Sequence, residues 1–267
     1  MKPTTLSPKL LLCALLGSPL FAQAYYGTAF EIAPDDQTAC EHSIALPTGY
    51  HFSEFTPDCV YNENLTPVSN GEQFGFSDNK GNIVIKPQFE MAYGFDEGVA
   101  LVKQNGKYGY INPNGKFAIK PQFSDAWGFW EGRAKVIIDD KAGFIDKTGK
   151  MVIAPNFDDA GNWFEEGLVS AKKGNKWGFI DKMGKTKIAF KYDDVEDFSE
   201  GYAVVGKDTQ KTDEHNDPIF SYGYIDTKGK QVLPYKYSYA SSFEQGVATV
   251  IDDGQFQLID YQGNVIE

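Results

Sequence analysis

Apolar and polar positions fall in short runs along most of the chain, and turns that contain glycine separate these runs. The stretch 176–185 is the clearest example: an aromatic-Gly-aromatic-Ile-Asp run is followed three residues later by Gly184. Short apolar runs bounded by Asp and Gly are typical of β-strands joined by tight turns. The pattern therefore predicts a strand, a turn and a second strand.

This stretch recurs at a nearly constant interval. Its central glycine appears again in other copies, and a glutamine replaces it in the last: Gly75, Gly109, Gly143, Gly178, Gly223 and Gln257. The steps between these positions are 34, 34, 35, 45 and 34 residues. A regular internal period indicates an array of one supersecondary unit. We therefore expect an all-β fold of tandem meander repeats of ~34 residues each.

The turn within each unit follows from its residues. Asp146–Lys150 has Asp at the start of a type I turn and glycine at the left-handed position of a G1 bulge. This turn should join a strand at 143–146 to an antiparallel strand at 151–153. Pro155 is expected to end the second strand, because proline cannot donate to the ladder.

The rest of the unit is an acidic segment, a Glu-Gly pair and a third strand of small apolar residues such as 168–171. The acidic segment is expected to form a helical turn anchored by a buried Phe. The strand that holds the motif glycine has large apolar residues at adjacent positions, Phe144 and Ile145, so both of its faces should be covered. We expect a neighbouring aromatic ring to pack on the glycine itself.

The unit resembles the WG (or KWG) repeat family of bacterial proteins over residues 72–267, although only Trp177 keeps the tryptophan. The resemblance implies an all-β repeat fold and an interaction role, and it brings no catalytic residues. Residues 72–267 would hold five repeats and a partial sixth, stacked as an open twisted solenoid. The alternative is a closed propeller-like ring, in which a strand near Cys59–Tyr61 completes the sixth unit.

The first 71 residues lie outside the repeat. Residues 1–24 have the basic start, apolar run and Ala-x-Ala site of a secretory signal peptide, which predicts an exported protein, periplasmic or secreted. Residues 25–71 are expected to form an N-terminal cap. A disulfide between Cys40 and Cys59 would staple this cap in an oxidising compartment. No later segment is apolar enough to span a membrane.

Charge narrows the range of partners. The net charge is −12, and removal of residues 1–24, which hold two lysines and no acids, makes it −14. A protein with a single arginine and this balance is a poor nucleic-acid ligand. A partner protein, possibly basic, is the better expectation.

No catalytic, cofactor or metal residues are predicted. Asp-Asp and Glu-Glu pairs suggest glycosidase chemistry, but they recur at one repeat position, which points to architecture. Clustered carboxylates leave a calcium site open, although no Asp-x-Asp-x-Asp-Gly loop is present. The three histidines lie outside the regular repeats, and their spacing predicts no zinc site.

Two groups of residues are candidates for binding. Trp127 and Trp163 are expected at one repeat position as core anchors, whereas Trp130 is extra to the pattern and, with Trp127, could form an aromatic ledge. The insertion 206–220 accounts for the 45-residue step and is expected to be a long exposed hairpin loop, with more acids than lysines. Its candidate binding residues are Asp208, Asp213, Glu214 and Asp217.

Two functions remain open on this basis. The first is a non-catalytic exported module for protein–protein interaction, possibly an inhibitor or immunity protein that blocks an exported toxin. The second is a protein that binds or hydrolyses carbohydrate or peptidoglycan with surface carboxylates and the tryptophan cluster.

Overall fold

The computed structural model describes residues 44–53 and 65–266. These residues form β-strands and no helix, arranged as successive antiparallel sheets. The predicted disulfide and signal peptide, and a strand near Cys59–Tyr61, lie outside the described residues.

Six sheets follow one another in chain order, and each is a simple meander. The first is β1 (His51–Phe52), β2 (Leu65–Ser69), β3 (Phe74–Asp78) and β4 (Ile83–Phe89). The second is β5 (Met91–Asp96), β6 (Val99–Gln104), β7 (Lys107–Ile111) and β8 (Phe117–Phe123). The third is β9 (Asp125–Ala126), β10 (Ala134–Ile138), β11 (Lys141–Ile145) and β12 (Met151–Phe157).

The fourth sheet is β13 (Asp159–Ala160), β14 (Leu168–Lys173), β15 (Lys176–Asp181) and β16 (Thr186–Tyr192). The fifth is β17 (Asp194–Val195), β18 (Tyr202–Thr212), β19 (Pro218–Asp226) and β20 (Gln231–Tyr237). The sixth is β21 (Tyr239–Ala240), β22 (Ala248–Asp252) and β23 (Gln255–Ile259), with one further bridge from Ile259 to Val265.

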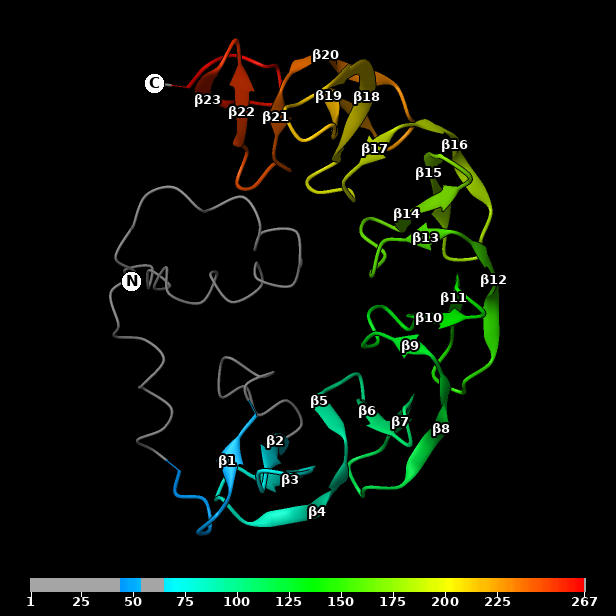
Figure 1. The fold of residues 1–267 in the computed structure, drawn as a ribbon, viewed down its shortest axis with the longest axis vertical. Helices are drawn as coiled ribbons and strands as arrows, with labels where there is room; N and C mark the ends of the chain where they lie inside the picture. Colours follow the sequence, from blue (N-terminus) through cyan, green and yellow to red (C-terminus); the bar gives the residue numbers. More distant parts are fainter. Residues whose placement is uncertain (1–43, 54–64, 267) are drawn as a thin grey trace, which may run out of the picture.

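Figure 1 shows the six sheets along an arc, with the first and sixth at its two ends. The short first strands, such as β9 and β13, lie on the inner side of the arc, and fourth strands such as β8 and β12 lie on the outer side. The first sheet includes Leu65–Ser69, so regular pairing begins before residue 72.

The predicted hairpin turn is confirmed. Gly149 has a φ of 82°, its N–H donates to the carbonyl of Asp146 at 2.9 Å, and the Asp146 side chain accepts from the N–H groups of Thr148 and Lys150. The register pairs Phe144 with Ile153, as expected for antiparallel strands. Local turn chemistry therefore fixes this part of the unit.

Pro155 does not end the second strand, which continues to Phe157. Ala142 pairs with Phe157 and Phe144 with Ile153, so three residues of β12 oppose the single residue Gly143 of β11, and the strand bulges at the proline. The bulge spares the proline from ladder pairing while the strand continues.

This bulge explains the motif glycine, which was expected to lie under an aromatic ring. At Gly178 a Cβ atom would lie 2.7 Å from the carbonyl oxygen of Ile188 and 2.9 Å from the backbone of Ala189 and Phe190. The covering group is therefore the backbone of the next strand. Only glycine permits so close an approach of two strands.

The acidic segment forms a short inner strand, not a helical turn. In the third sheet this strand is β9, and the chain then reaches a two-residue turn at Glu131 and Gly132. Both residues have positive φ, 49° and 74°, and Trp130 and Arg133 exchange two backbone hydrogen bonds across them. These are the features of a type I′ hairpin, which accounts for the recurring Glu-Gly pair.

The anchor phenylalanines are buried, as predicted, and the structure shows that they hold neighbouring sheets together. Each packs on the motif aromatic of the preceding sheet at a ring-centroid distance of 4.8–5.0 Å. The pairs are Phe76–Phe95, Tyr110–Phe129, Phe144–Phe164, Phe179–Phe198 and Tyr224–Phe243. Phe144 and Ile145 belong to different core clusters, so both faces of their strand are covered.

Glutamates of the Glu-Gly turns link successive sheets. The side chains of Glu97, Glu166 and Glu200 each accept a hydrogen bond from the backbone N–H of the glycine in the corresponding turn of the following sheet. The distances are 3.0, 2.6 and 2.9 Å. The Glu200 carboxylate also accepts from the Tyr261 hydroxyl at 2.9 Å. Hydrogen bonds from the Gly246 N–H, and then from Tyr261 and the Gln245 N–H, lower the pKa of Glu200.

We expect Glu200→Gln to lower the free energy of unfolding at pH 7 by less than about 1 kcal/mol, since the site is exposed to solvent. Because the folded-state pKa is depressed, the charged group stabilises above its ordinary pKa of 4.5, and this contribution is lost as pH falls through the folded-state pKa. Urea unfolding at pH 7 and pH 3 measures the difference. Glu244 directly precedes the corresponding turn of the sixth sheet and serves as the control. Glu244→Gln should leave the free energy of unfolding unchanged at both pH values.

Candidate functional site

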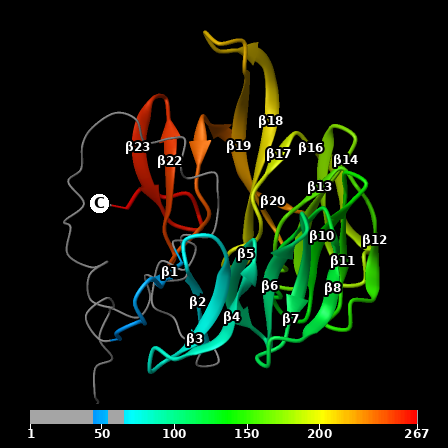
Figure 2. The same cartoon turned by 60° about the horizontal axis from the view of Figure 1, so that its bottom comes forward.

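The insertion forms a β-ribbon, which we define as residues 207–219. It is not an irregular loop: β18 and β19 continue past the edges of their neighbours and pair with each other up to Thr212 and Pro218. Figure 2 shows this ribbon projecting from the fifth sheet beyond the other strands. The residues near its tip are exposed, as the sequence predicted.

Two of the predicted acids shape the ribbon. The Asp213 carboxylate accepts the N–H groups of His215 and Asp217 at 2.8 and 3.0 Å, which repeats the motif turn, with Asn216 at the left-handed position. The Asp208 carboxylate accepts the Gln210 N–H at 2.7 Å within a bulge. Glu214 and Asp217 are exposed at the tip.

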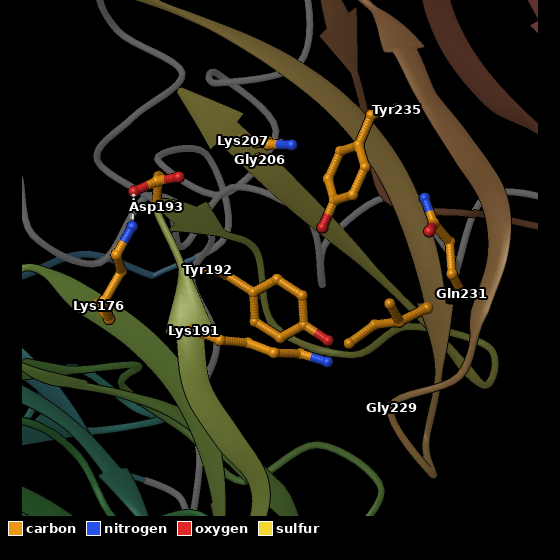
Figure 3. Close-up of a pocket in the computed structure, with 10 residues that line it drawn as sticks. Lys176, Lys191, Tyr192, Asp193, Gly206, Lys207, Gly229, Gln231 and Tyr235 are labelled. Atoms are coloured by element: carbon orange, nitrogen blue, oxygen red, sulfur yellow. Dashed lines mark hydrogen bonds and ion pairs between the residues drawn. The ribbon is translucent and has the colours of Figure 1, made fainter. Parts of the chain in front are cut away.

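A groove of about 380 Å³ lies at the foot of the ribbon, between the fourth and fifth sheets. Figure 3 shows Tyr192 from β16 and Tyr235 from β20 on its two sides. Lys176, Lys191 and Lys207 also line it, so the groove is rich in hydrogen-bond donors although the protein is acidic.

Asp193 connects the groove to the ribbon. It forms an ion pair with Lys176 and accepts the Asp208 N–H at 3.1 Å. Burial alone would raise the pKa of Asp193, but the hydrogen bonds from Lys176 and from the Asp208 N–H lower it below its ordinary value. Burial, the Tyr192 hydroxyl and the Asp193 charge raise the pKa of Tyr235, which keeps its hydroxyl protonated at neutral pH.

At the preceding junction, between the third and fourth sheets, the aromatic rings contact each other directly. There Phe157 and Phe190 stack at 6.1 Å, and the Lys173 ammonium lies 4.9 Å from the first ring and 5.4 Å from the second. The corresponding residues of the groove are Tyr192, Tyr235 and Lys207. The sequence reading missed them, although tyrosine at 235, where other units have Pro87, Pro121 or Pro155, was a visible signal.

The two tryptophans of the predicted ledge have different environments. The Trp127 ring lies 4.3 Å from the ammonium of Lys135, whose exposed fraction is only 4%. That ammonium also donates to the carbonyl of Ala160 at 2.5 Å and to Asp159 at 3.2 Å. Trp127 therefore packs on an internal lysine, whereas Trp130 is 51% exposed.

Trp127 and Trp163 are not equivalent positions. The backbone N–H of Trp127 donates to the Lys135 carbonyl. At the matching place in the fourth sheet, the backbone N–H of Gly161 donates to the Ser170 carbonyl. The extra residue in the fourth unit shifts Trp163 to the place next to Phe164. Trp127 and Trp130 lie between β9 and β10 of the third sheet, whereas the four acids lie on the ribbon of the fifth, so the two candidate groups are separate.

Within the described part of the chain, no group of three His, Cys, Asp or Glu side chains could hold a metal ion. The same residues include no helix that is long and apolar enough to cross a membrane.

Comparison with known proteins identifies the repeat but no function. No curated protein matches the sequence. A crystal structure titled as the eukaryotic initiation factor is similar over 84% of this chain and 66% of its own, with 12% identity and a TM-score of 0.52. This chain thus spans just under two thirds of that protein, and the likeness concerns the fold alone.

The Neurospora crassa Pan2 WD40 domain matches 75% of this chain and 73% of its own, with 13% identity and a TM-score of 0.37. The family model described as WG containing repeat matches residues 74–108, 108–141, 143–177, 177–208 and 222–256. These matches cover more than half of the chain, which therefore belongs to the WG containing repeat family.

Proposed function

We propose that this protein is an exported, non-catalytic module that binds another protein through the ribbon and the groove at its foot. The observation that carries the proposal is the ribbon itself. Sheet packing and turn chemistry account for the regular positions of the array, whereas residues 207–219 project from it and pair with neither β17 nor β20. An inhibitor or immunity protein against an exported toxin fits this description.

The ribbon offers two kinds of contact. Glu214 and Asp217 at the tip favour a basic surface, while Lys191, Lys207 and the Tyr235 hydroxyl at the foot suit a carboxylate or backbone carbonyl. Exposed charges of this kind act mainly on the association rate, and salt screens them. The partner's association rate should therefore fall as salt is added.

The chain supplies its own template for removing the ribbon. Lys207 pairs with Ser221 as Lys173 pairs with Lys176 in the fourth sheet, where Gly174 and Asn175 close the hairpin. The Gly174 N–H binds Asp158 at 2.6 Å, the counterpart of the bond from Asp208 to Asp193. Replacement of residues 208–220 by Gly-Asn should therefore preserve the fifth sheet.

We expect this replacement to change the free energy of unfolding by less than about 1 kcal/mol, since loop length enters closure entropy only logarithmically. It should weaken binding of the partner recovered from the source cell envelope at least about tenfold. Calorimetry of the partner with both forms measures the effect, and Trp130→Ala is the matched control. Unchanged affinity without the ribbon would move the site elsewhere.

A glycan-binding or glycan-hydrolysing protein is the second candidate, because Trp130 is an exposed aromatic ring and the next residue, Glu131, carries a carboxylate, which pairs with Lys182. Turnover or binding of peptidoglycan fragments that disappears in Trp130→Ala and survives ribbon removal would favour it.

For the architecture we propose the open twisted solenoid, with the closed ring as the alternative. Separation of the two ends of the arc is the feature that favours the open form.

A further inference from the structure

The sixth sheet exposes apolar side chains. Its strand β23 and the residues that follow hold four of the nine large hydrophobic side chains that are exposed in the described chain. They are Phe256 at 75%, Leu258 at 49%, Val265 at 58% and Ile266 at 38% exposed. Phe256 and Leu258 are two residues apart and share one face of β23, whereas Val265 pairs with Ile259 of the other face. Exposed apolar side chains gathered on one face usually mark an interface.

Leu258 occupies a position that is buried in every other sheet. Val250 pairs with Gln257 as Val136 pairs with Gly143, so Leu258 corresponds to the motif aromatic. The five motif aromatics have an exposed fraction of 0%: Phe76, Tyr110, Phe144, Phe179 and Tyr224. An anchor phenylalanine of the following sheet covers each of them, and among the described residues none covers Leu258.

The other end of the arc differs. The first sheet would face a preceding sheet with Thr66, Val68 and Ser77, and these residues are 1%, 0% and 0% exposed. That side is already buried within the molecule. Head-to-tail packing of the sixth sheet of one copy on the first sheet of another is therefore blocked.

We propose that the sixth sheet packs on the sixth sheet of a second copy, as a two-fold dimer. A two-fold interface needs one self-complementary patch per molecule, and each copy carries one. Sheets pack face to face through apolar side chains. The strand Gln255–Ile259 contains no charged residue, so its own side chains bring no charge into the contact. The patch lies on a different sheet from the ribbon and does not depend on it.

The test is the oligomeric state of the purified protein, measured by sedimentation equilibrium over a wide range of concentration. The unaltered protein should form dimers, and Phe256→Glu should raise the dimer dissociation constant at least about tenfold. Phe256 is 75% exposed, so the variant should fold normally, as its circular dichroism will show. Met183→Glu, at a 72% exposed residue of the fourth sheet, is the control and should leave the dimer unchanged.

Salt gives an independent readout. Each copy carries a net charge of −12, so the copies repel one another and added salt should strengthen the dimer. Binding of a basic partner would weaken under the same conditions. A protein that stays monomeric at all concentrations overturns the proposal, and residues 25–43 or a different protein would then cover the patch. A dimer that survives both Phe256→Glu and Leu258→Glu overturns it as well.

Discussion

Gly178→Val should lower the free energy of unfolding by about 3 kcal/mol or more, because overpacking against a backbone cannot be relieved by a side-chain rotation. The added Cβ would lie 2.7 Å from the Ile188 carbonyl oxygen. The strand of Ile188 would have to move away from β15, which breaks the pairing of Phe179 with Ile188. Thermal and urea unfolding measure the loss.

The smaller change Gly178→Ala should already be destabilising, since the clash begins at Cβ. Gly128 is the matched control: it lacks a positive φ, and a Cβ there meets only the Asp96 carboxylate at 3.7 Å. Gly128→Ala should change stability by less than about 1 kcal/mol. Equal unfolding midpoints for Gly178→Val and the unaltered protein would refute the backbone-contact explanation of the repeat.

Phe164→Ala is expected to cost about 3–5 kcal/mol, the usual range for a buried phenylalanine. Phe164 is 1% exposed and packs at 5.0 Å on Phe144, so its removal opens a cavity between the third and fourth sheets. Because repeat arrays are stabilised by nearest-neighbour interfaces, the loss should fall on this junction. Hydrogen exchange should show it as faster exchange of amides in β11 and β14.

Trp130→Ala is the control for this variant, because it removes a larger ring from the surface. Half of the Trp130 side chain is already in solvent, and no core cluster includes it. We expect Trp130→Ala to lower the free energy of unfolding by much less than Phe164→Ala does. If both variants unfolded at the same midpoint, the anchor role of the recurring phenylalanine would be wrong.

Local chemistry made much of the fold predictable. The Asp-x-x-Gly turn depends on residues within five positions of each other, and Gly149 and Asp146 adopt the predicted geometry. The sequence did not predict that β12 continues through Pro155. The bulge that allows this depends on pairing with β11, whose facing residue at the bulge lies more than ten positions earlier in the chain. The exposed position of the acids near the ribbon tip was predicted, but the groove of Tyr192, Tyr235 and Lys207 was not.

The sequence by itself determined the repeat, its period, the turns and the recurring phenylalanine anchors, because each depends on local backbone preferences or on apolar spacing. Only the tertiary structure decided which group covers Gly178, that Lys135 is buried against Trp127, and that Leu258 is exposed while Tyr224 is not. The cover on Gly178 comes from the neighbouring strand of its own sheet, whereas the burial of Lys135 and the exposure of Leu258 are decided where one sheet meets the next. Neighbouring repeats have nearly the same sequence pattern, so exposure depends on whether another sheet follows.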